Sequence, residues 1–438
     1  MKGGYAAARA RRRTTDVVVV GAGSAGASAA IAAAESGADV VLVDRLPIVG
    51  GTSTAVLDTL YAFYTAGSEP RRVVGGIGWR VGQELLGRGA AFFRPNSFGS
   101  GTGLTYDPEA LKVVWNDLLA QARVTVLTGT VMVDAEADDS GVEVTLAAKG
   151  GLTQLRAVTA VDGSGDGDLA LACGAKALQD NEFVQPATMT FRLGNVDEQR
   201  AFPPGGIRMR DHLERAEAEG VGIPGIGGSV HRTPLPGVVL AAMTRVPSPR
   251  PDDVSDWREA EVMARRQVQD LVAFLRGRVP GFEHCFLIDT SDVVGVRETR
   301  RIRGRHVLTE AELLDASVPP ESIALCGAPI EDLAHQPTRW RHVPEPGFYG
   351  IPLGTLLPDG LGSIAVAGRC LSATHEAHSS ARSMATCMAM GQAAGTLAAL
   401  AANAGKPLPD VPFVVLRNTL IAGDAILDLP VAAPEAVA

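Results

Sequence analysis

"DVVVVGAGSAGASAA", residues 16–30, decides the fold of this chain. The four valines at 17–20 predict a buried strand, and the small residues at 27–36 predict a helix. Three glycines in the spacing G-x-G-x-x-G join the two: Gly21, Gly23 and Gly26. The first permits a tight turn, the second lets the backbone approach a pyrophosphate, and the third lets helix and strand pack closely. The stretch therefore predicts a Rossmann-like unit that binds a dinucleotide, with the phosphates at the helix N-terminus.

A second strand and a second glycine turn distinguish FAD from NAD. The stretch "DVVLVD" ends at Asp44, where a carboxylate hydrogen-bonds ribose hydroxyls and repels a 2′-phosphate. The glycine pair Gly50 and Gly51 follows in "RLPIVGGTST" and lets the backbone approach the other side of the pyrophosphate. An NAD dehydrogenase does not need this second turn, so the sequence favours FAD.

Composition excludes several classes of protein. The chain has 438 residues, of which 46% are hydrophobic, so it can bury a large core. A net charge of −9 argues against nucleic acid or an anionic membrane as the main partner. The five cysteines contain no C-x-x-C pair, which argues against a disulfide framework or any metal site.

The N-terminal segment "ARARRRTT" resembles a twin-arginine export signal, but the apolar run after it carries the glycine fingerprint. The weakly polar run "CMAMGQAAGTLAALAA" is too short and too rich in Gly and Ala to span a bilayer. We therefore expect a cytoplasmic protein without a membrane span.

The rest of the chain predicts an α/β fold in which a discontinuous Rossmann-like domain carries an inserted α+β substrate domain. A helix is expected at 107–122 with Asp107 as its N-cap, followed by an antiparallel meander made of 124–136, 141–148 and 155–165. A long amphipathic helix is expected near 254–278. The expected domains are the first part of the cofactor domain at 15–178, the inserted domain at 179–345, the second part of the cofactor domain at 346–405, and a C-terminal segment at 406–438.

Two further blocks have the texture of a cofactor domain. "AVDGSGDGDLA", residues 160–170, places glycines at a strand end. In 364–400, a strand ends at Gly368 and a helix of small residues covers 382–400. The N-terminus of this helix would stabilise negative charge on a reduced flavin ring, and "MGQAAG" would let it pack tightly on the nucleotide strands.

These blocks, with "VPGFE", "VGVRETRRIRG" and "AGRCLSATHEA", resemble the FAD-dependent oxidoreductase family, which is related to glutathione-reductase-like and fumarate-reductase-like flavoproteins. The histidine that links flavin covalently in fumarate-reductase-type proteins is missing from "GGTSTAV", so noncovalent FAD is expected. The resemblance implies the following cofactor-binding residues: Gly21, Gly23, Ser24, Ala25, Gly26, Asp44, Arg45, Gly50, Gly51, Thr52, Val131, Gly163, Gly165, Gly368, Arg369, Arg382, Ser383 and Met384.

His375 and Glu376 are the first catalytic candidates. They lie in an expected loop between the last strand and the last helix, which in related flavoproteins faces the reactive edge of the ring. A histidine there could accept a proton while hydride leaves for flavin N5. The alternatives are a structural role for His375, or His378 as the active residue.

Arginines and two residues of the later chain supply further candidates. On an expected strand, Arg301 would share a face with Arg297 and Arg303 and fork a substrate carboxylate, or else pair with nearby acids. His335 and Tyr349 could close over the flavin. Cys370 is expected to be a buried small residue.

The predicted function is a dehydrogenase or oxidase that transfers hydride from a small organic substrate to FAD. Oxygen, a quinone or a protein would then accept the electrons. The sequence is compatible with a homo-oligomer as well as with a monomer. One alternative is a flavin monooxygenase or halogenase, although the W-x-W-x-I-P pattern of tryptophan halogenases is absent. The other is a non-catalytic electron-transfer subunit, whose expected cysteine-rich motifs are also absent.

Overall fold

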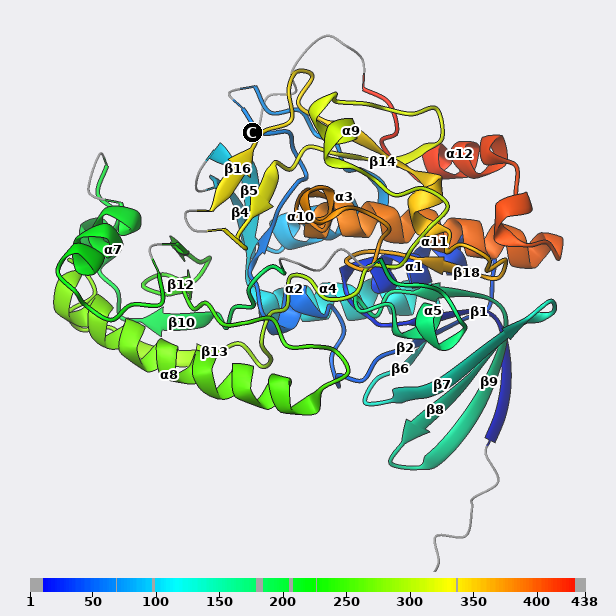
Figure 1. Cartoon of the computed structure of the whole chain (residues 1–438), viewed down its shortest axis with the longest axis horizontal. Coiled ribbons are helices and arrows are strands. Elements are labelled where there is room, and N and C mark those ends of the chain that lie inside the picture. The colour runs from blue at the N-terminus through cyan, green and yellow to red at the C-terminus, as the bar shows by residue number, and fades with distance from the viewer. Residues whose placement is uncertain are drawn as a thin grey trace, which may run out of the picture.

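The computed structural model describes residues 11–67, 69–96, 99–178, 184–204, 208–225, 227–335 and 338–429 (Figure 1). A large mixed sheet with helices packed on it forms the main body, and a smaller sheet with a long helix extends to one side.

The main sheet has seven strands in the order β6-β2-β1-β9-β8-β7, with β18 also paired to β9. Their bounds are β1 Arg11–Val20, β2 Val40–Val43, β6 Thr125–Leu127, β7 Val131–Asp138, β8 Gly141–Ala148, β9 Gly151–Asp162 and β18 Ile364–Val366. β1 runs parallel to β2 and β9, and its four valines are buried, as a strand covered on both faces requires. The predicted α/β fold with a Rossmann-like cofactor unit is confirmed.

Two expectations about these strands change. The described part of the basic N-terminal segment, Arg11 to Thr15, lies in β1 and pairs with β9. β7, β8 and β9 form the predicted antiparallel meander, but β6 does not belong to it. β6 pairs in parallel with β2 instead, because α4 (Pro108–Gln121) carries the chain back to the edge of the parallel sheet.

Two helices of small residues pack against each other over this sheet, α1 (Ser24–Glu35) and α11 (Met384–Ala404) (Figure 1). A Cβ on Gly391 would lie 2.1 Å from the carbonyl oxygen of Ala25, and one on Gly395 would lie 2.0 Å from that of Ala29. The "MGQAAG" glycines therefore bring α11 onto α1, rather than chiefly onto the strands as predicted. Among the described residues, α11 is the one helix long and apolar enough to cross a membrane, and 89% of its apolar window is buried in the fold.

The large core also includes several shorter elements. Asp107 caps α4 as predicted, since its side chain accepts a hydrogen bond from the backbone N–H of Glu109. The remaining helices around this core are α2 Thr52–Ala55, α3 Gly76–Gly87, α5 Asp168–Ala172, α9 Glu310–Leu314, α10 His375–Ala381, α12 Phe413–Ala422 and the 3₁₀ turns η2 Leu353–Leu356 and η3 Leu408–Asp410. The small sheets are β3 (Thr59–Leu60), β5 (Thr102–Tyr106) and β4 (Ala91–Pro95); β14 (Ser322–Cys326) and β17 (Tyr349–Pro352); and β15 (Ile330–Asp332) and β16 (Arg339–Arg341).

A second core lies under the inserted sheet β11-β12-β10-β13. Its elements are β10 Phe191–Gly194, α6 Glu198–Ala201, α7 Met209–Ala218, β11 Ser229–Arg232, β12 Val239–Ala242, α8 Val254–Arg278 and β13 Phe286–Thr290. α8 is the long helix that the sequence predicted. The buried residues of this core run from Ala187 to Val296, whereas Leu308 and Ile330 pack in the large core. The segment after about residue 300, which the sequence analysis joined to the inserted domain, thus packs with the cofactor unit.

Candidate functional site

A cavity of about 230 Å³ lies at the carboxyl ends of β1, β2 and β9, where parallel α/β sheets bind nucleotides. Most of the residues predicted to bind cofactor line it: Gly21, Gly23, Ser24, Ala25, Asp44, Arg45, Gly51, Thr52, Gly163, Gly165, Gly368, Arg369, Arg382 and Met384. Gly26, Gly50, Val131 and Ser383 do not. We call this space the cofactor cavity.

Close backbone contacts explain the glycines. Gly21 has φ +95°, and a Cβ there would lie 2.4 Å from the carbonyl oxygen of Gly163. A Cβ on Gly26 would lie 1.7 Å from the Gly21 carbonyl oxygen, so Gly26 packs helix on strand without reaching the cavity. A Cβ on Gly50 would likewise lie 2.4 Å from the Thr54 Cγ2 atom. Val131 is exposed on β7, away from the cavity.

The cofactor cavity offers groups that suit FAD. Ser24 Oγ is buried at the N-terminus of α1 and has no hydrogen-bond partner among the described residues, which suits a phosphate oxygen. The Asp44 carboxylate accepts the N–H of Ala22 at 2.5 Å and that of Leu46 at 2.7 Å. Burial raises the pKa of Asp44, while these two N–H groups lower it. Its remaining lone pairs can accept ribose hydroxyls.

The inserted domain reaches the same cavity through Trp257 on α8. The guanidinium carbon of Arg45 lies 5.8 Å from the centre of the Trp257 ring, within the range of a cation–π contact. Both residues line the end of the cavity that contains Asp44. The sequence analysis missed Trp257, because nothing in a helical repeat shows which residue will cover a distant cavity.

A second cavity of about 250 Å³ adjoins the first, and we call it the inner cavity. The two share five lining residues: Leu57, Thr188, Arg297, Arg382 and Met384. The inner cavity lies between the large core and the inserted sheet, since Ala62 and Ala328 line one side and Ala242 and Met243 the other. A molecule in the inner cavity would therefore lie next to the cofactor.

Among the described residues that line the inner cavity, Glu331 is the one acidic residue, and the sequence analysis missed it. Among the described residues, no group donates a hydrogen bond to its carboxylate. Burial raises the pKa of Glu331, and the positive charges of Arg382 and Arg297 oppose this. Successive side chains of a strand point to opposite faces, so Glu331 faces the cavity while Asp332, its neighbour on β15, faces away.

The positive charges of two arginines, Arg382 and Arg297, act on the Glu331 carboxylate. The Nε and Nη2 atoms of Arg382 are buried and have no hydrogen-bond partner among the described residues. Burial lowers the pKa of Arg382, and Glu331 raises it. Arg297 donates from Nη1 to the carbonyl oxygen of Pro186, at 2.9 Å, and to Thr188. Burial and the charge of Arg382 lower the pKa of Arg297 to about 10, so Arg297 remains charged at neutral pH.

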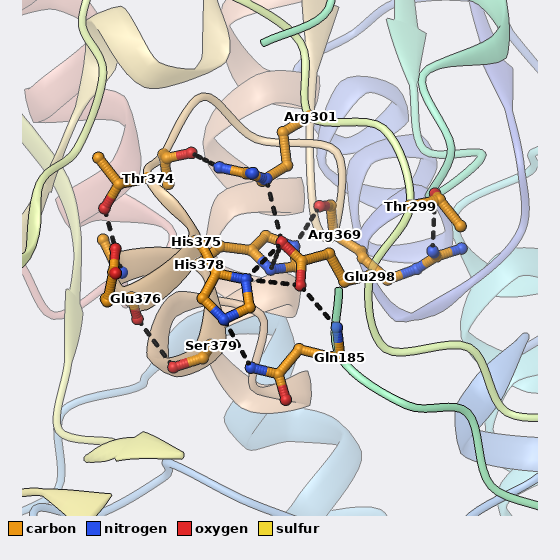
Figure 2. A network of polar contacts seen from close by, with 12 residues as sticks. Gln185, Glu298, Thr299, Arg301, Arg369, Thr374, His375, Glu376, His378 and Ser379 are labelled. Atoms are coloured by element: carbon orange, nitrogen blue, oxygen red, sulfur yellow. Dashed lines mark hydrogen bonds and ion pairs between the residues drawn. The ribbon is translucent and has the colours of Figure 1, made fainter. Parts of the chain in front are cut away.

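His375 is held between the carboxylates of Glu298 and Asp332 and lines neither cavity; Figure 2 shows its contact with Glu298. Its Nδ1 lies 2.9 Å from Glu298 Oε2, and its Nε2 lies 3.2 Å from Asp332 Oδ1. Burial lowers the pKa of His375, but the hydrogen bonds to Asp332 and Glu298 raise it to about 9. The imidazolium therefore keeps its proton at neutral pH and is not the proton acceptor that the sequence predicted. His375 also begins α10 instead of lying in a loop.

Glu298 organises the same cluster from the opposite side (Figure 2). Burial alone would raise the pKa of Glu298, but His375, His378 and Arg301 lower it to about 2. Arg301 is fully buried, with Nε 3.2 Å from Glu298 Oε1, and it also donates to the carbonyl oxygen of Ala373. Arg301 thus has its carboxylate partner within the protein and lines neither cavity.

The predicted common face of Arg297, Arg301 and Arg303 is wrong. The segment makes isolated bridges, such as that of Ile302 with Ala177, and forms no continuous strand. Tertiary contacts therefore set each side chain separately: Arg297 reaches the cavities, Arg301 is buried elsewhere, and Arg303 is exposed.

The other catalytic candidates line neither cavity. His378 is fully buried; its Nε2 donates to the Arg369 carbonyl oxygen at 2.8 Å, and burial lowers its pKa to about 3. Glu376 is half-buried on α10. His335 is partly exposed, 3.2 Å from Asp332 Oδ2. Tyr349 is buried, with its hydroxyl 2.8 Å from Ser380 Oγ.

Comparisons with known proteins agree with this geometry. Residues 16–420 match the sequence profile described as "FAD dependent oxidoreductase". The chain is similar in fold to p-nitrophenol 4-monooxygenase from Pseudomonas putida DLL-E4, with a TM-score of 0.50, 13% identity, and coverage of 94% of this chain and 85% of that one. It is also similar to the flavin-dependent brominase Bmp2, with a TM-score of 0.50, 14% identity, and coverage of 92% and 83%. No curated protein matches the sequence. At these identities the two structures show the fold alone.

Proposed function

Since the chain belongs to the FAD dependent oxidoreductase family, we propose that it oxidises a small organic substrate by hydride removal, as a dehydrogenase or an oxidase. Bound FAD supplies the hydride acceptor, its N5 atom. The observation that carries the proposal is the unpartnered Glu331 carboxylate in the inner cavity, which shares a wall with the cofactor cavity.

Glu331 is the proton acceptor. When a C–H bond next to an O–H or N–H group gives up hydride, the heteroatom loses its proton and a C=O or C=N bond forms. The ionised carboxylate of Glu331 takes that proton. Because burial raises its pKa toward neutral pH, Glu331 is a stronger base than an exposed glutamate.

The surrounding residues position this carboxylate. Asp332 next to it is bonded to His375, and His375 is bonded to Glu298, so β15 is tied to the segment at residue 298. We assign His375 as a positioning residue, which keeps Glu331 facing the inner cavity. Leu57 and Met384, on the shared wall, exclude water from the space between substrate and cofactor.

The rival function is a flavin monooxygenase or halogenase, whose flavin is reduced by an external nicotinamide. The fold similarity to such enzymes keeps this rival open. The test is anaerobic mixing of the holoenzyme with a panel of alcohols, amines and hydroxy acids, and separately with NADH and NADPH. We expect a substrate to bleach the flavin without nicotinamide. Bleaching by NADH or NADPH alone would favour the rival. Reoxidation by oxygen, a quinone or a protein then identifies the electron acceptor.

A further inference from the structure

The charges of the inner cavity are unbalanced. In the part of the chain that the structure describes, four arginines line it, Arg210, Arg245, Arg297 and Arg382, against the single carboxylate of Glu331. Arg210 lies close to Glu214, with its Nε 2.7 Å from Oε1, and Arg245 donates to the Leu333 carbonyl oxygen at 2.6 Å. Arg297 and Arg382 are the two whose positive charges lower the pKa of Glu331, and the charge of Arg382 also lowers the pKa of Arg297.

Among the described residues that line the inner cavity, one carboxylate faces two buried guanidinium groups. Two guanidinium groups repel one another in a cavity of low dielectric, and Glu331 offsets only one of them. Glu298 also acts on Arg382, but it lies outside the cavity and is already paired with His375 and Arg301. The Nε and Nη2 atoms of Arg382 are buried without an acceptor, and buried donors in native proteins almost always have one. A ligand carboxylate would accept from Arg382 and relieve its repulsion with Arg297, and a planar guanidinium suits that geometry.

The rest of the cavity wall combines apolar side chains with serines and threonines. Its larger hydrophobic members are Leu57, Met243, Leu333, Trp340 and Met384. We propose that the substrate is a small carboxylic acid with an apolar body, whose carboxylate is held by Arg297 and Arg382. This assignment rests on the proposed function, which makes the inner cavity the substrate site.

Equilibrium binding tests the assignment without turnover. Benzoate and hexanoate are titrated into the holoenzyme at pH 7, with benzamide and hexanamide as uncharged controls, and the visible difference spectrum of the flavin reports binding. We expect each carboxylate to bind at least about tenfold more tightly than its amide. Arg297→Met and Arg382→Met are expected to weaken carboxylate binding by about 10- to 100-fold and to leave amide binding unchanged.

Two further variants keep the test decisive. Arg303→Met removes an exposed arginine outside the cavity and is expected to bind like the parent. Arg297→Lys keeps the charge without the fork and is expected to bind between parent and Arg297→Met. FAD content is measured first for every variant. Equal binding of acid and amide, or parent-like binding of carboxylate by Arg297→Met, overturns the proposal. Loss of FAD from Arg382→Met with normal carboxylate binding in Arg297→Met overturns it too.

The result separates this inference from the function on which it rests. If carboxylates bind through the arginines but no substrate bleaches the flavin anaerobically, hydride transfer fails and the carboxylate site stands. If an uncharged alcohol or amine bleaches the flavin while carboxylates do not bind, the function stands and the substrate class is wrong.

Discussion

Glu331 and Asp332 are neighbours on β15, yet their carboxylates serve opposite faces of the strand. Glu331 lines the inner cavity without a partner among the described residues, whereas Asp332 is bonded to His375 at 3.2 Å. Burial raises the pKa of Glu331, while burial of Asp332 is outweighed by its bond to His375, which lowers the pKa of that carboxyl. One strand thus carries the carboxylate that we propose as the base and a carboxylate bonded within the protein.

The first prediction concerns Glu331. Glu331→Gln should slow flavin reduction by substrate by about 10²- to 10⁴-fold, because a positioned base contributes that much, and should leave FAD content unchanged. In the parent, the reduction rate should fall as pH falls through the raised pKa of Glu331, because protonation removes the base. Anaerobic stopped-flow bleaching across pH measures both effects.

Glu376→Gln is the matched control, because Glu376 is a half-buried glutamate outside both cavities. It should reduce at the parental rate with the parental pH profile. A slow Glu376→Gln beside a normal Glu331→Gln would return the proton acceptor to Glu376, which the sequence analysis named as a catalytic candidate.

The second prediction concerns the stability supplied by His375. Its folded pKa of about 9 lies above the ordinary 6.5, so its contribution is complete below about pH 6.5 and is lost as pH rises toward 9. The melting temperature of the parent should therefore fall over this window, and the fall should be smaller in His375→Gln. At pH 6 this variant should be less stable by roughly 3–5 kcal/mol, since two buried carboxylates lose their partner.

His284→Gln removes an exposed histidine and should melt like the parent at every pH. Glu298, the carboxylate that pairs with His375, should give the opposite dependence of stability on pH. Glu298 has a pKa lowered to about 2, so its contribution should be lost as pH falls from about 4.5 toward 2. A parent whose melting temperature is flat between pH 6.5 and 9 would show that His375 is not clamped as an imidazolium.

Sequence patterns predicted the parts of the fold that are built from neighbours in the chain. The turn at Gly21, the strand ending at Asp44 and the cap at Asp107 each depend on residues close in sequence, so spacing alone identifies them. The role of His375 depends on Glu298 and Asp332, which are 77 and 43 residues away. No local pattern reports such a contact. The sequence around a histidine does not show whether the side chain will lie between two carboxylates or beside a flavin.

Glu331 was missed for a different reason. β15 has three residues, too few to show the period-two alternation that reveals which face is buried. Its direction is set by pairing with β16, where Glu331 lies opposite Trp340. The prediction for the arginines at 297–303 was wrong for the opposite reason. It assumed strand alternation in a segment that forms only isolated bridges and no continuous strand.

The third prediction tests the contact between α1 and α11. The Cβ that Gly391→Ala adds would lie 2.1 Å from the carbonyl oxygen of Ala25, so one helix must shift. We expect a loss of roughly 1–3 kcal/mol in the free energy of unfolding, and a lower FAD content, because α1 carries Ser24 at the cofactor cavity. Urea unfolding and the ratio of flavin to protein absorbance measure the two effects.

Gly277→Ala is the control, since Gly277 is also helical, on α8, and a Cβ there meets nothing within 4 Å. It should keep its FAD and be as stable as the parent or slightly more stable. If Gly391→Ala behaves like this control, α11 does not determine how α1 presents the cofactor cavity.

The last prediction concerns Asp44. Asp44→Ala should weaken FAD binding by about 10- to 100-fold, the effect of losing one hydrogen bond to a charged group. Two causes are possible in principle: a lost bond to the adenosine ribose, or a loosened turn, because Asp44 also accepts the N–H groups of Ala22 and Leu46. ADP, which contains that ribose, and FMN, which lacks it, separate the two causes when titrated into the apoprotein. If Asp44 holds the ribose, ADP binding weakens as FAD binding does and FMN binding stays unchanged. Equal weakening of ADP and FMN would assign the effect to the turn.

Asp16→Ala is the control, since that carboxylate also accepts a backbone N–H, from Asp39 at 2.8 Å, but lies outside the cofactor cavity. Parental FAD affinity in Asp44→Ala would show that neither a ribose contact of Asp44 nor its bond to the Ala22 N–H fixes the cofactor, and would leave Ser24 as the group at the N-terminus of α1 that does so.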